Sequence, residues 1–69
     1  MKMSTRNIVK GKVVDLKEGM VMAKVKVDIG GGQMMTAIVT VEAVKELNVQ
    51  MGDDIKLLIK ATSVMLGKD

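Results

Sequence analysis

The 69-residue sequence predicts one all-β domain that contains a single short helix. Most of the chain consists of short runs rich in β-branched residues and separated by glycine-containing turns, which is typical of strands. Only one segment has apolar residues at helical spacing. A chain of this length suffices for one domain and no more, so we expect residues 1–69 to fold as a single unit.

Three strands are expected before the helix. Residues 8–19 are rich in β-branched side chains, and residues 20–32 alternate apolar and polar side chains, as in a half-buried strand. Three successive glycines, residues 30–32, predict a turn, and residues 33–40 follow as the third strand. The expected inward face of the second strand consists of alternate apolar residues, namely Val21, Ala23, Val25, Val27 and Ile29.

The hydrophobic period changes between residues 40 and 52. Apolar side chains there recur at helical spacing, at Val41, Val44 and Leu47. Thr40 is the expected N-cap, because its hydroxyl can accept a hydrogen bond from the first turn. Asn48 can end the helix in the left-handed conformation.

Two further strands are expected after the helix, at residues 55–61 and 63–67. The order is then strand, strand, strand, helix, strand, strand. Many short strands in a small chain favour a closed or partly closed barrel, and a helix between the third and fourth strands is the arrangement of an OB-fold. We therefore predict a small five-stranded OB-like barrel.

The composition excludes several classes of function. The chain has neither Cys nor His, so disulfides and the usual ligands of zinc, copper and iron–sulfur sites are excluded. No Ser–His or Cys–His pair can form an activated nucleophile, and we expect no enzyme activity. A domain this small is only marginally stable as a monomer, which favours a homo-oligomer. No apolar run approaches the roughly 18 residues of a membrane span, and a signal-peptide h-region is missing, so we expect a cytoplasmic protein.

Charge is distributed unevenly along the chain. Residues 1–26 contain seven basic residues (Lys or Arg) and two acidic ones (Asp or Glu). Residues 27–69 contain four basic and six acidic residues. A basic first half suggests an anionic partner, and the alternative is a set of solvated strand faces. Asp53 and Asp54 have no spacing typical of a metal loop or an active site, so we expect them to be surface charges.

The first cluster of hydrogen-bond donors is STRN, residues 4–7. Ser4 and Thr5 offer hydroxyls and Arg6 a planar fork of five donors, a set that suits an oxyanion whose oxygens all accept hydrogen bonds. The alternative is a polar tail that leads into a strand.

Two more donor clusters follow. Lys60 stands in an otherwise apolar strand and is followed by the hydroxyls of Thr62 and Ser63, although the pattern also fits an outward lysine and a polar turn. At the start of the helix, the hydroxyl of Thr40 and the N–H of Ala43 could attract an anion. The alternative there is an N-cap that serves only its own helix.

Together the three clusters resemble the molbindins (Mop proteins), the single-domain form of the molybdate-binding TOBE domain. The resemblance lies in three motifs that keep the family's order and cover nearly the whole chain: STRN-x-x-KGKV at 4–13, TAIVT-x-E-x-V-x-x-L at 36–47 and IKATSVML at 59–66. It implies an OB-like barrel that assembles as a hexamer, a trimer of dimers. It also implies a cytoplasmic role in intracellular molybdenum storage or homeostasis, with molybdate or tungstate held between subunits.

The resemblance further implies which residues hold the oxyanion: Ser4, Thr5, Arg6, Thr40, Ala43, Lys60, Ala61 and Thr62. The first and last clusters are expected to come from different subunits. Molybdenum is expected as intact molybdate with no direct protein ligand, and no other cofactor or metal is implied. The chain departs from the family at Ile8, where Gln is common, and at Ala43 and Thr62, where Ser is usual.

A pocket that contains only donors would select among oxyanions. Every oxygen of molybdate accepts hydrogen bonds at neutral pH, whereas hydrogen phosphate carries a proton that would lack an acceptor, at a cost of about 1–3 kcal/mol. Sulfate must be rejected by its size. Tungstate matches molybdate in size and charge, so we expect little discrimination between them.

Two other functions remain open on the sequence. An oxyanion-sensing regulatory or oligomerisation module would have the same fold and the same pocket. A nucleic-acid-binding OB module would fit the basic first half, but single-strand binders gain about 1–3 kcal/mol per base from stacking on aromatic residues. The chain has no aromatic residue, so nucleic acid is the weaker alternative.

Overall fold

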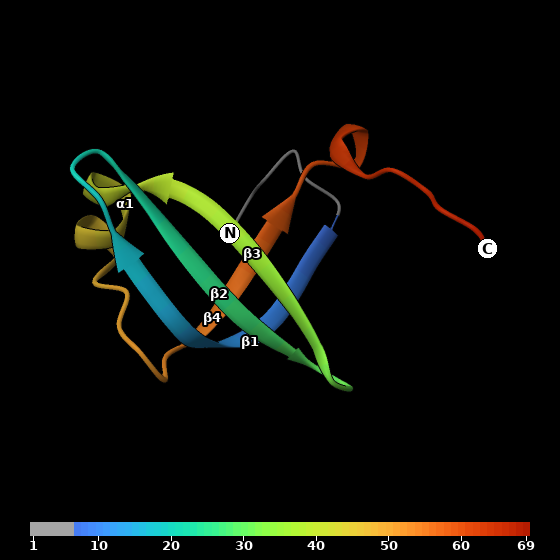
Figure 1. Ribbon diagram of the computed structural model, residues 1–69, viewed down its shortest axis with the longest axis horizontal. Coiled ribbons are helices and arrows are strands. Elements are labelled where there is room, and N and C mark those ends of the chain that lie inside the picture. Colours follow the sequence, from blue (N-terminus) through green and yellow to red (C-terminus); the bar gives the residue numbers. More distant parts are fainter. Residues whose placement is uncertain (1–6) are drawn as a thin grey trace.

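Four strands form one curved antiparallel sheet, and a short helix packs at one end of it (Figure 1). The structure, a computed structural model, describes residues 7–69. The strands lie in the order β3-β2-β1-β4, so β3 and β4 are its two edges. The elements in chain order are β1 (Asn7–Glu18), β2 (Met22–Gly30), β3 (Gln33–Thr40), α1 (Val41–Leu47), β4 (Asp54–Ile59) and the 3₁₀ turn η1 (Ala61–Ser63). The prediction of a mostly β fold with one short α-helix is confirmed.

Strand β1 connects the two halves of the sheet. Its first half pairs with β4 and its second half with β2, with a register shift between Val13 and Asp15. Gly11 lies where the halves meet, and a Cβ atom there would approach the Cγ1 of Val27 to 2.4 Å and the carbonyl oxygen of Asp28 to 2.7 Å. Glycine is therefore required at this position by close packing, because no side chain fits between β1 and β2.

The hairpin between β2 and β3 confirms the expected glycine turn. Gly31 and Gly32 have φ angles of 63° and 77°. Positive φ at both central residues defines a type I′ turn, which matches the twist of the two strands. The amide of Gly30 donates a 2.8 Å hydrogen bond to the Oδ1 of Asp28, which supports the turn from the side.

Helix α1 begins and ends where the sequence predicts. Thr40 is the N-cap, and its hydroxyl oxygen accepts a 3.0 Å hydrogen bond from the amide of Ala43. Asn48 ends the helix with a φ angle of 53°. Val44 is the buried residue of the helix and packs into the core. Within the described part of the chain, no helix is long and apolar enough to cross a membrane.

The core is small and almost entirely valine. Its buried members are Val13, Ala23, Val25, Val27 and Val44. The expected inward face of the second strand is confirmed for its three central positions. The prediction is wrong for Val21, which is 69% exposed, because the strand begins only at Met22.

The end of the chain departs from the prediction. The fourth strand ends at Ile59 instead of residue 61, and residues 63–67 form no strand. The five strands and the closure of the predicted OB-like barrel are therefore not confirmed, because the described residues of one chain form a sheet of four strands that does not close. A strand needs a neighbour with which to exchange backbone hydrogen bonds, and residues 64–69 run away from the sheet (Figure 1).

Candidate oxyanion site

The start of β1 and the end of β4 lie side by side. Asn7 is the cross-strand partner of Ile59, and its side-chain Nδ2 donates a 3.1 Å hydrogen bond to the carbonyl oxygen of Ile59. The cluster at residues 4–7 leads into this pair, and the cluster that starts at Lys60 leaves from it. Both clusters are therefore attached at one end of the sheet of one chain. Ser4, Thr5 and Arg6 themselves lie outside the described residues.

The second cluster occupies a tight turn. Lys60 is exposed and precedes η1, with φ and ψ of −63° and 135°, and its side chain makes no capping hydrogen bond. Its carbonyl accepts a 2.8 Å hydrogen bond from the amide of Ser63, and the amide of Val64 donates to the carbonyl of Ala61 at 3.3 Å. Ala61 and Thr62 are exposed within this turn. The ammonium and the threonine hydroxyl are thus presented to solvent from a hydrogen-bonded backbone.

The third cluster is already engaged within its own helix. The amide of Ala43 donates to the hydroxyl oxygen of Thr40, as in the alternative that the sequence left open. A hydroxyl that accepts one hydrogen bond keeps its own hydrogen for donation. Thr40 is exposed, so its hydroxyl can still donate outward to an anion, whereas the amide of Ala43 is used by the cap.

One chain keeps Thr40 apart from Lys60. Thr40 pairs with Met22 at the start of β2, which lies near the last residues of β1. Lys60 instead follows Ile59, which pairs with Asn7, the first residue of β1. Figure 1 accordingly shows α1 and the turn after β4 at opposite ends of the sheet. A single site that contains both of these donors requires a second copy of the chain.

The two adjacent carboxylates at the start of β4, Asp53 and Asp54, differ in their contacts. Asp54 is a surface charge, as expected, with its side chain 92% exposed and 4.0 Å from the ammonium of Lys12. Asp53 is half-buried and has a further role that was not expected, because its Oδ2 accepts a 2.9 Å hydrogen bond from the amide of Gln50. The short turn QMGD at residues 50–53 is the sequence signal for this role, because Asp commonly accepts local backbone hydrogen bonds. Within residues 7–69, no group of three or more acidic residues is arranged to hold a metal ion.

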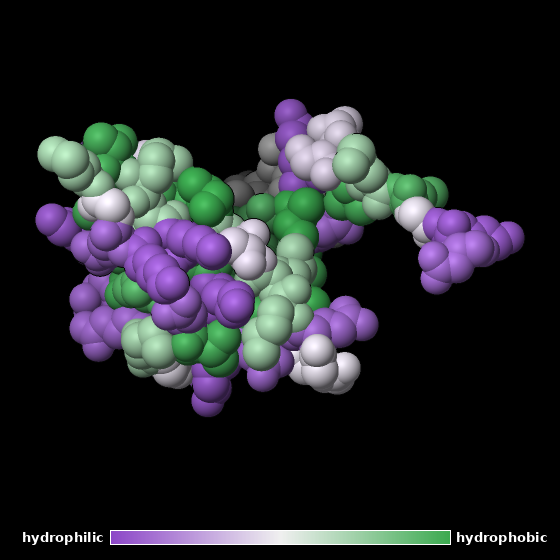
Figure 2. Space-filling model, in the orientation of Figure 1, coloured by the Kyte–Doolittle hydropathy of each residue, from purple (hydrophilic) through white to green (hydrophobic). Residues whose placement is uncertain are grey.

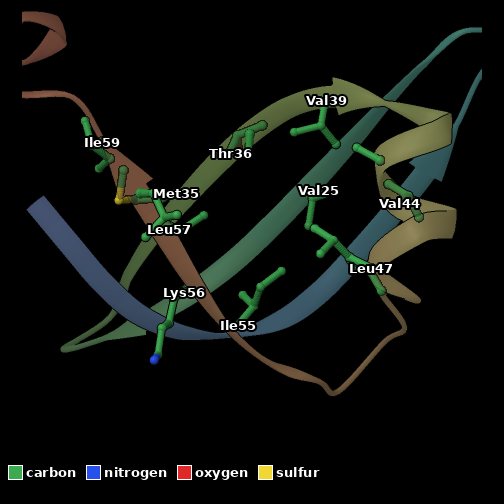
Figure 3. Close-up of a pocket in the computed structure, with 14 residues that line it drawn as sticks. Val25, Met35, Thr36, Val39, Val44, Leu47, Ile55, Lys56, Leu57 and Ile59 are labelled. Atoms are coloured by element: carbon green, nitrogen blue, oxygen red, sulfur yellow. The ribbon is translucent and has the colours of Figure 1, made fainter. Parts of the chain in front are cut away.

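An apolar hollow that the sequence analysis missed lies between the two edge strands. Its volume is about 270 Å³. Figure 3 shows side chains from β3, α1 and β4 around it, among them Val39, Val44, Leu47, Ile55 and Leu57. Its walls are mostly apolar, with Thr36 and Lys56 as the polar residues among those that line it, so a dianion would lose its hydration there for few hydrogen-bond donors in return.

Comparison with known proteins identifies the family. A model of the TOBE domain matches residues 3–66. A probable molybdenum-pterin-binding protein of Haemophilus influenzae is 52% identical over 67 residues, which cover 97% of each chain. Molybdenum-pterin-binding protein 1 of Clostridium pasteurianum is 44% identical, over 96% of this chain and 97% of its own.

Solved structures agree with this fold. A molybdate-binding protein from Sporomusa ovata is 35% identical and superimposes with a TM-score of 0.92, covering 99% of this chain and 100% of its own. MopII from Clostridium pasteurianum is 42% identical with a TM-score of 0.90, over 97% and 100% of the two chains. The sequence and the fold together show that this chain belongs to the TOBE domain family and, within it, to the molbindin (Mop) proteins.

Proposed function

We propose that this chain is a cytoplasmic molybdate-binding protein that stores or buffers molybdenum and also accepts tungstate. The observation that carries the proposal is the pairing of Asn7 with Ile59, which places the last residue of the first cluster beside the end of the strand that precedes Lys60. The relatives support the ligand, because one solved neighbour, the cytoplasmic molybdate-binding protein ModG, is described with molybdate bound and is 39% identical over 88% of this chain.

The chemistry of the donors suits a proton-free dianion. The ammonium of Lys60 and the guanidinium of Arg6 supply charge-assisted hydrogen bonds, and the hydroxyls of Thr62 and Thr40 supply neutral ones. Donors of this kind bind the oxide oxygens and leave molybdenum without a protein ligand. The proposed binding step involves no covalent chemistry, so we propose no catalytic role.

The arrangement of the donors favours a site that subunits share. Thr40 and Lys60 lie at opposite ends of the sheet, so a site with both draws them from two copies. In the assembly that we propose, a hexamer built as a trimer of dimers, each subunit of 69 residues acts as one oxyanion-binding domain and contributes one cluster to its neighbour's site. Binding and assembly then stabilise the same state, since a ligand that bridges subunits binds only the assembled form.

Native mass spectrometry tests ligand, selectivity and assembly in one experiment. The purified chain is measured alone and with sodium molybdate, tungstate, sulfate or phosphate at equal concentration. We expect a hexamer that gains molybdate or tungstate masses and gains none from sulfate or phosphate. A protein that binds none of the four anions, or binds sulfate as readily as molybdate, would contradict the proposed function.

A further inference from the structure

A second group of cations lies on β1 and β4, apart from the cluster at Lys60. The exposed positions alternate along both strands there, and the register places Lys10 opposite Lys56 and Lys12 opposite Asp54. Alternate side chains of a strand point to the same face, so these four side chains lie together on one face of the β1–β4 ladder. Figure 3 shows the ammonium group of Lys56 directed away from the apolar hollow, in agreement with this placement.

The four side chains border a shallow, open hollow of about 670 Å³. Its charged lining residues are Lys10, Lys12, Lys56, Asp28 and Asp54, and we call it the basic hollow. Figure 2 shows hydrophilic side chains gathered over the sheet, so an exposed lysine by itself marks no site on this molecule. The lysines of the basic hollow differ from one another in whether a carboxylate neutralises them.

The two carboxylates leave two of the three lysines unpaired. Asp54 lies 4.0 Å from the ammonium of Lys12, and Asp28 is the partner of Lys12 in β2 and accepts a 2.8 Å hydrogen bond from a backbone amide. In the described part of the chain, no acidic side chain forms an ion pair with Lys10 or Lys56. Like charges directly opposite each other destabilise a ladder, so an anion between these two ammonium groups would relieve their repulsion.

Hydrogen phosphate matches this arrangement in charge and in hydrogen bonding. Its two negative charges equal the two unpaired positive charges of Lys10 and Lys56, and its oxide oxygens accept hydrogen bonds from their ammonium groups. Its hydroxyl needs an acceptor, and the carboxylate of Asp54, which is 92% exposed, is next to Lys56 on the same face of β4. Sulfate and molybdate carry no proton at neutral pH, so the same carboxylate would only repel them.

We propose that the basic hollow is a second oxyanion site, which binds hydrogen phosphate between Lys10 and Lys56 while the phosphate hydroxyl donates to Asp54. This site goes beyond the proposed function, because it has the opposite selectivity: it supplies the acceptor that a pocket made only of donors lacks. Exposed ion pairs contribute little each, so we expect a dissociation constant on the order of 1 mM. At micromolar anion concentrations the site stays empty, and mass spectrometry then reports molybdate binding alone.

Solution NMR tests the site on the full chain. The ¹⁵N-labelled protein is titrated with sodium phosphate at constant ionic strength. The backbone amides of Gly11 and Gly30, which line the basic hollow, serve as reporters. We expect their chemical shifts to follow a saturating curve. Shifts that stay constant, or that change in proportion to phosphate without saturation, would overturn the proposal.

Two matched double variants separate a site from general surface charge. Lys10→Gln with Lys56→Gln removes both unpaired cations, and we expect phosphate to bind about 2- to 30-fold more weakly. This variant should fold as stably as the natural chain, because it removes a like-charge pair. Lys17→Gln with Lys24→Gln is the control and should bind phosphate normally, since these lysines are also exposed cross-strand partners but do not line the hollow. Equal losses of affinity in the two variants would overturn the proposal.

The role of Asp54 is tested by selectivity. Sodium sulfate and methyl phosphate are titrated in the same way, because sulfate and the methyl phosphate dianion have no hydroxyl to donate. We expect the natural chain to bind phosphate more tightly than either of them. Asp54→Ala should remove this preference, so that the ratio of phosphate affinity to sulfate affinity approaches one. A preference that survives in Asp54→Ala, or a natural chain that prefers methyl phosphate, would overturn the assignment of hydrogen phosphate.

A titration in the presence of saturating sodium molybdate shows whether the two sites are separate. We expect the phosphate curve at Gly11 and Gly30 to be unchanged by molybdate. Displacement of phosphate by molybdate would mean that one site serves both anions, and would overturn the proposal while leaving molybdate binding intact. A chain that binds phosphate in the basic hollow but ignores molybdate would instead overturn the proposed function alone.

Discussion

The side-chain amide of Asn7 donates a 3.1 Å hydrogen bond to the carbonyl oxygen of Ile59, which is 52 residues further along the chain. This bond closes the sheet at the end where the two donor clusters are attached. The asparagine of the STRN motif is therefore a structural residue, although it stands among residues expected to bind the ligand. Its position predicts that fold and affinity are coupled at this end of the molecule.

Asn7→Ala tests that coupling. The variant loses one partly buried hydrogen bond, which typically contributes about 0.5–1.5 kcal/mol to the free energy of unfolding. We expect a lower midpoint in thermal denaturation followed by circular dichroism, and weaker molybdate binding in isothermal titration calorimetry. A stability equal to wild type would show that the backbone ladder of β1 and β4 holds this end without the side chain.

Lys60→Ala tests the proposed site directly. A hydrogen bond to a charged group contributes about 1.5–3 kcal/mol, which corresponds to a loss of about 10- to 150-fold in molybdate affinity. Lys68→Ala is the matched control, since it removes the same charge from the exposed C-terminal tip. Equal affinities for the two variants in calorimetry would place the ligand elsewhere.

Substitutions at Thr40 test whether its hydroxyl caps the helix, binds the oxyanion or does both. Thr40→Ala removes the hydroxyl that accepts from Ala43, and loss of such a cap costs about 0.5–2 kcal/mol in stability. We expect Thr40→Ser to restore the thermal midpoint and the molybdate affinity, because serine keeps the hydroxyl. Thr36→Ala, on the same exposed face of β3, is the control and should leave the affinity unchanged. If Thr40→Ala loses stability but binds molybdate normally, Thr40 is a cap and no ligand.

Gly11→Ala should destabilise the packing of β1 against β2. The added methyl group would lie 2.4 Å from the Cγ1 of Val27, and overpacking of this kind costs about 1–3 kcal/mol. For a domain of this size, we expect the thermal midpoint to fall by about 4–8 °C for each kcal/mol. Gly67→Ala has nothing within 4 Å of the added atom and should leave the midpoint unchanged. Identical midpoints for the two variants would mean that β1 can shift to make room.

The sequence predicted the local elements well, because local signals specify them. Thr40 and Asn48 bound the helix as expected, and the three glycines before Gln33 form the expected turn. Each of these features depends on residues within one or two turns of the chain. The interior positions of β2 followed from alternation, which reports the face of a half-buried strand directly.

The predictions that failed depend on contacts between distant segments or between chains. The segment after Ser63 has the composition of a strand, but a strand forms only where a neighbour supplies hydrogen bonds. The structural roles of Gly11 and Asp53 were missed because they depend on the close packing of β1 against β2 and on the turn before β4. The sequence also does not reveal where Thr40 and Lys60 lie in one chain, because only the strand order places them at opposite ends of the sheet.

The long separation between Asn7 and Ile59 also has a kinetic consequence. The β2–β3 hairpin can nucleate locally around its glycine turn, whereas pairing of β1 with β4 must close most of the chain. We therefore expect the β1–β4 ladder to form late in folding and to open early in unfolding. The end of the sheet that carries the donor clusters is then completed last, so the capacity to bind reports that folding has finished. A bound oxyanion would act chiefly on the unfolding rate, because the contacts that it reinforces are absent from the folding transition state.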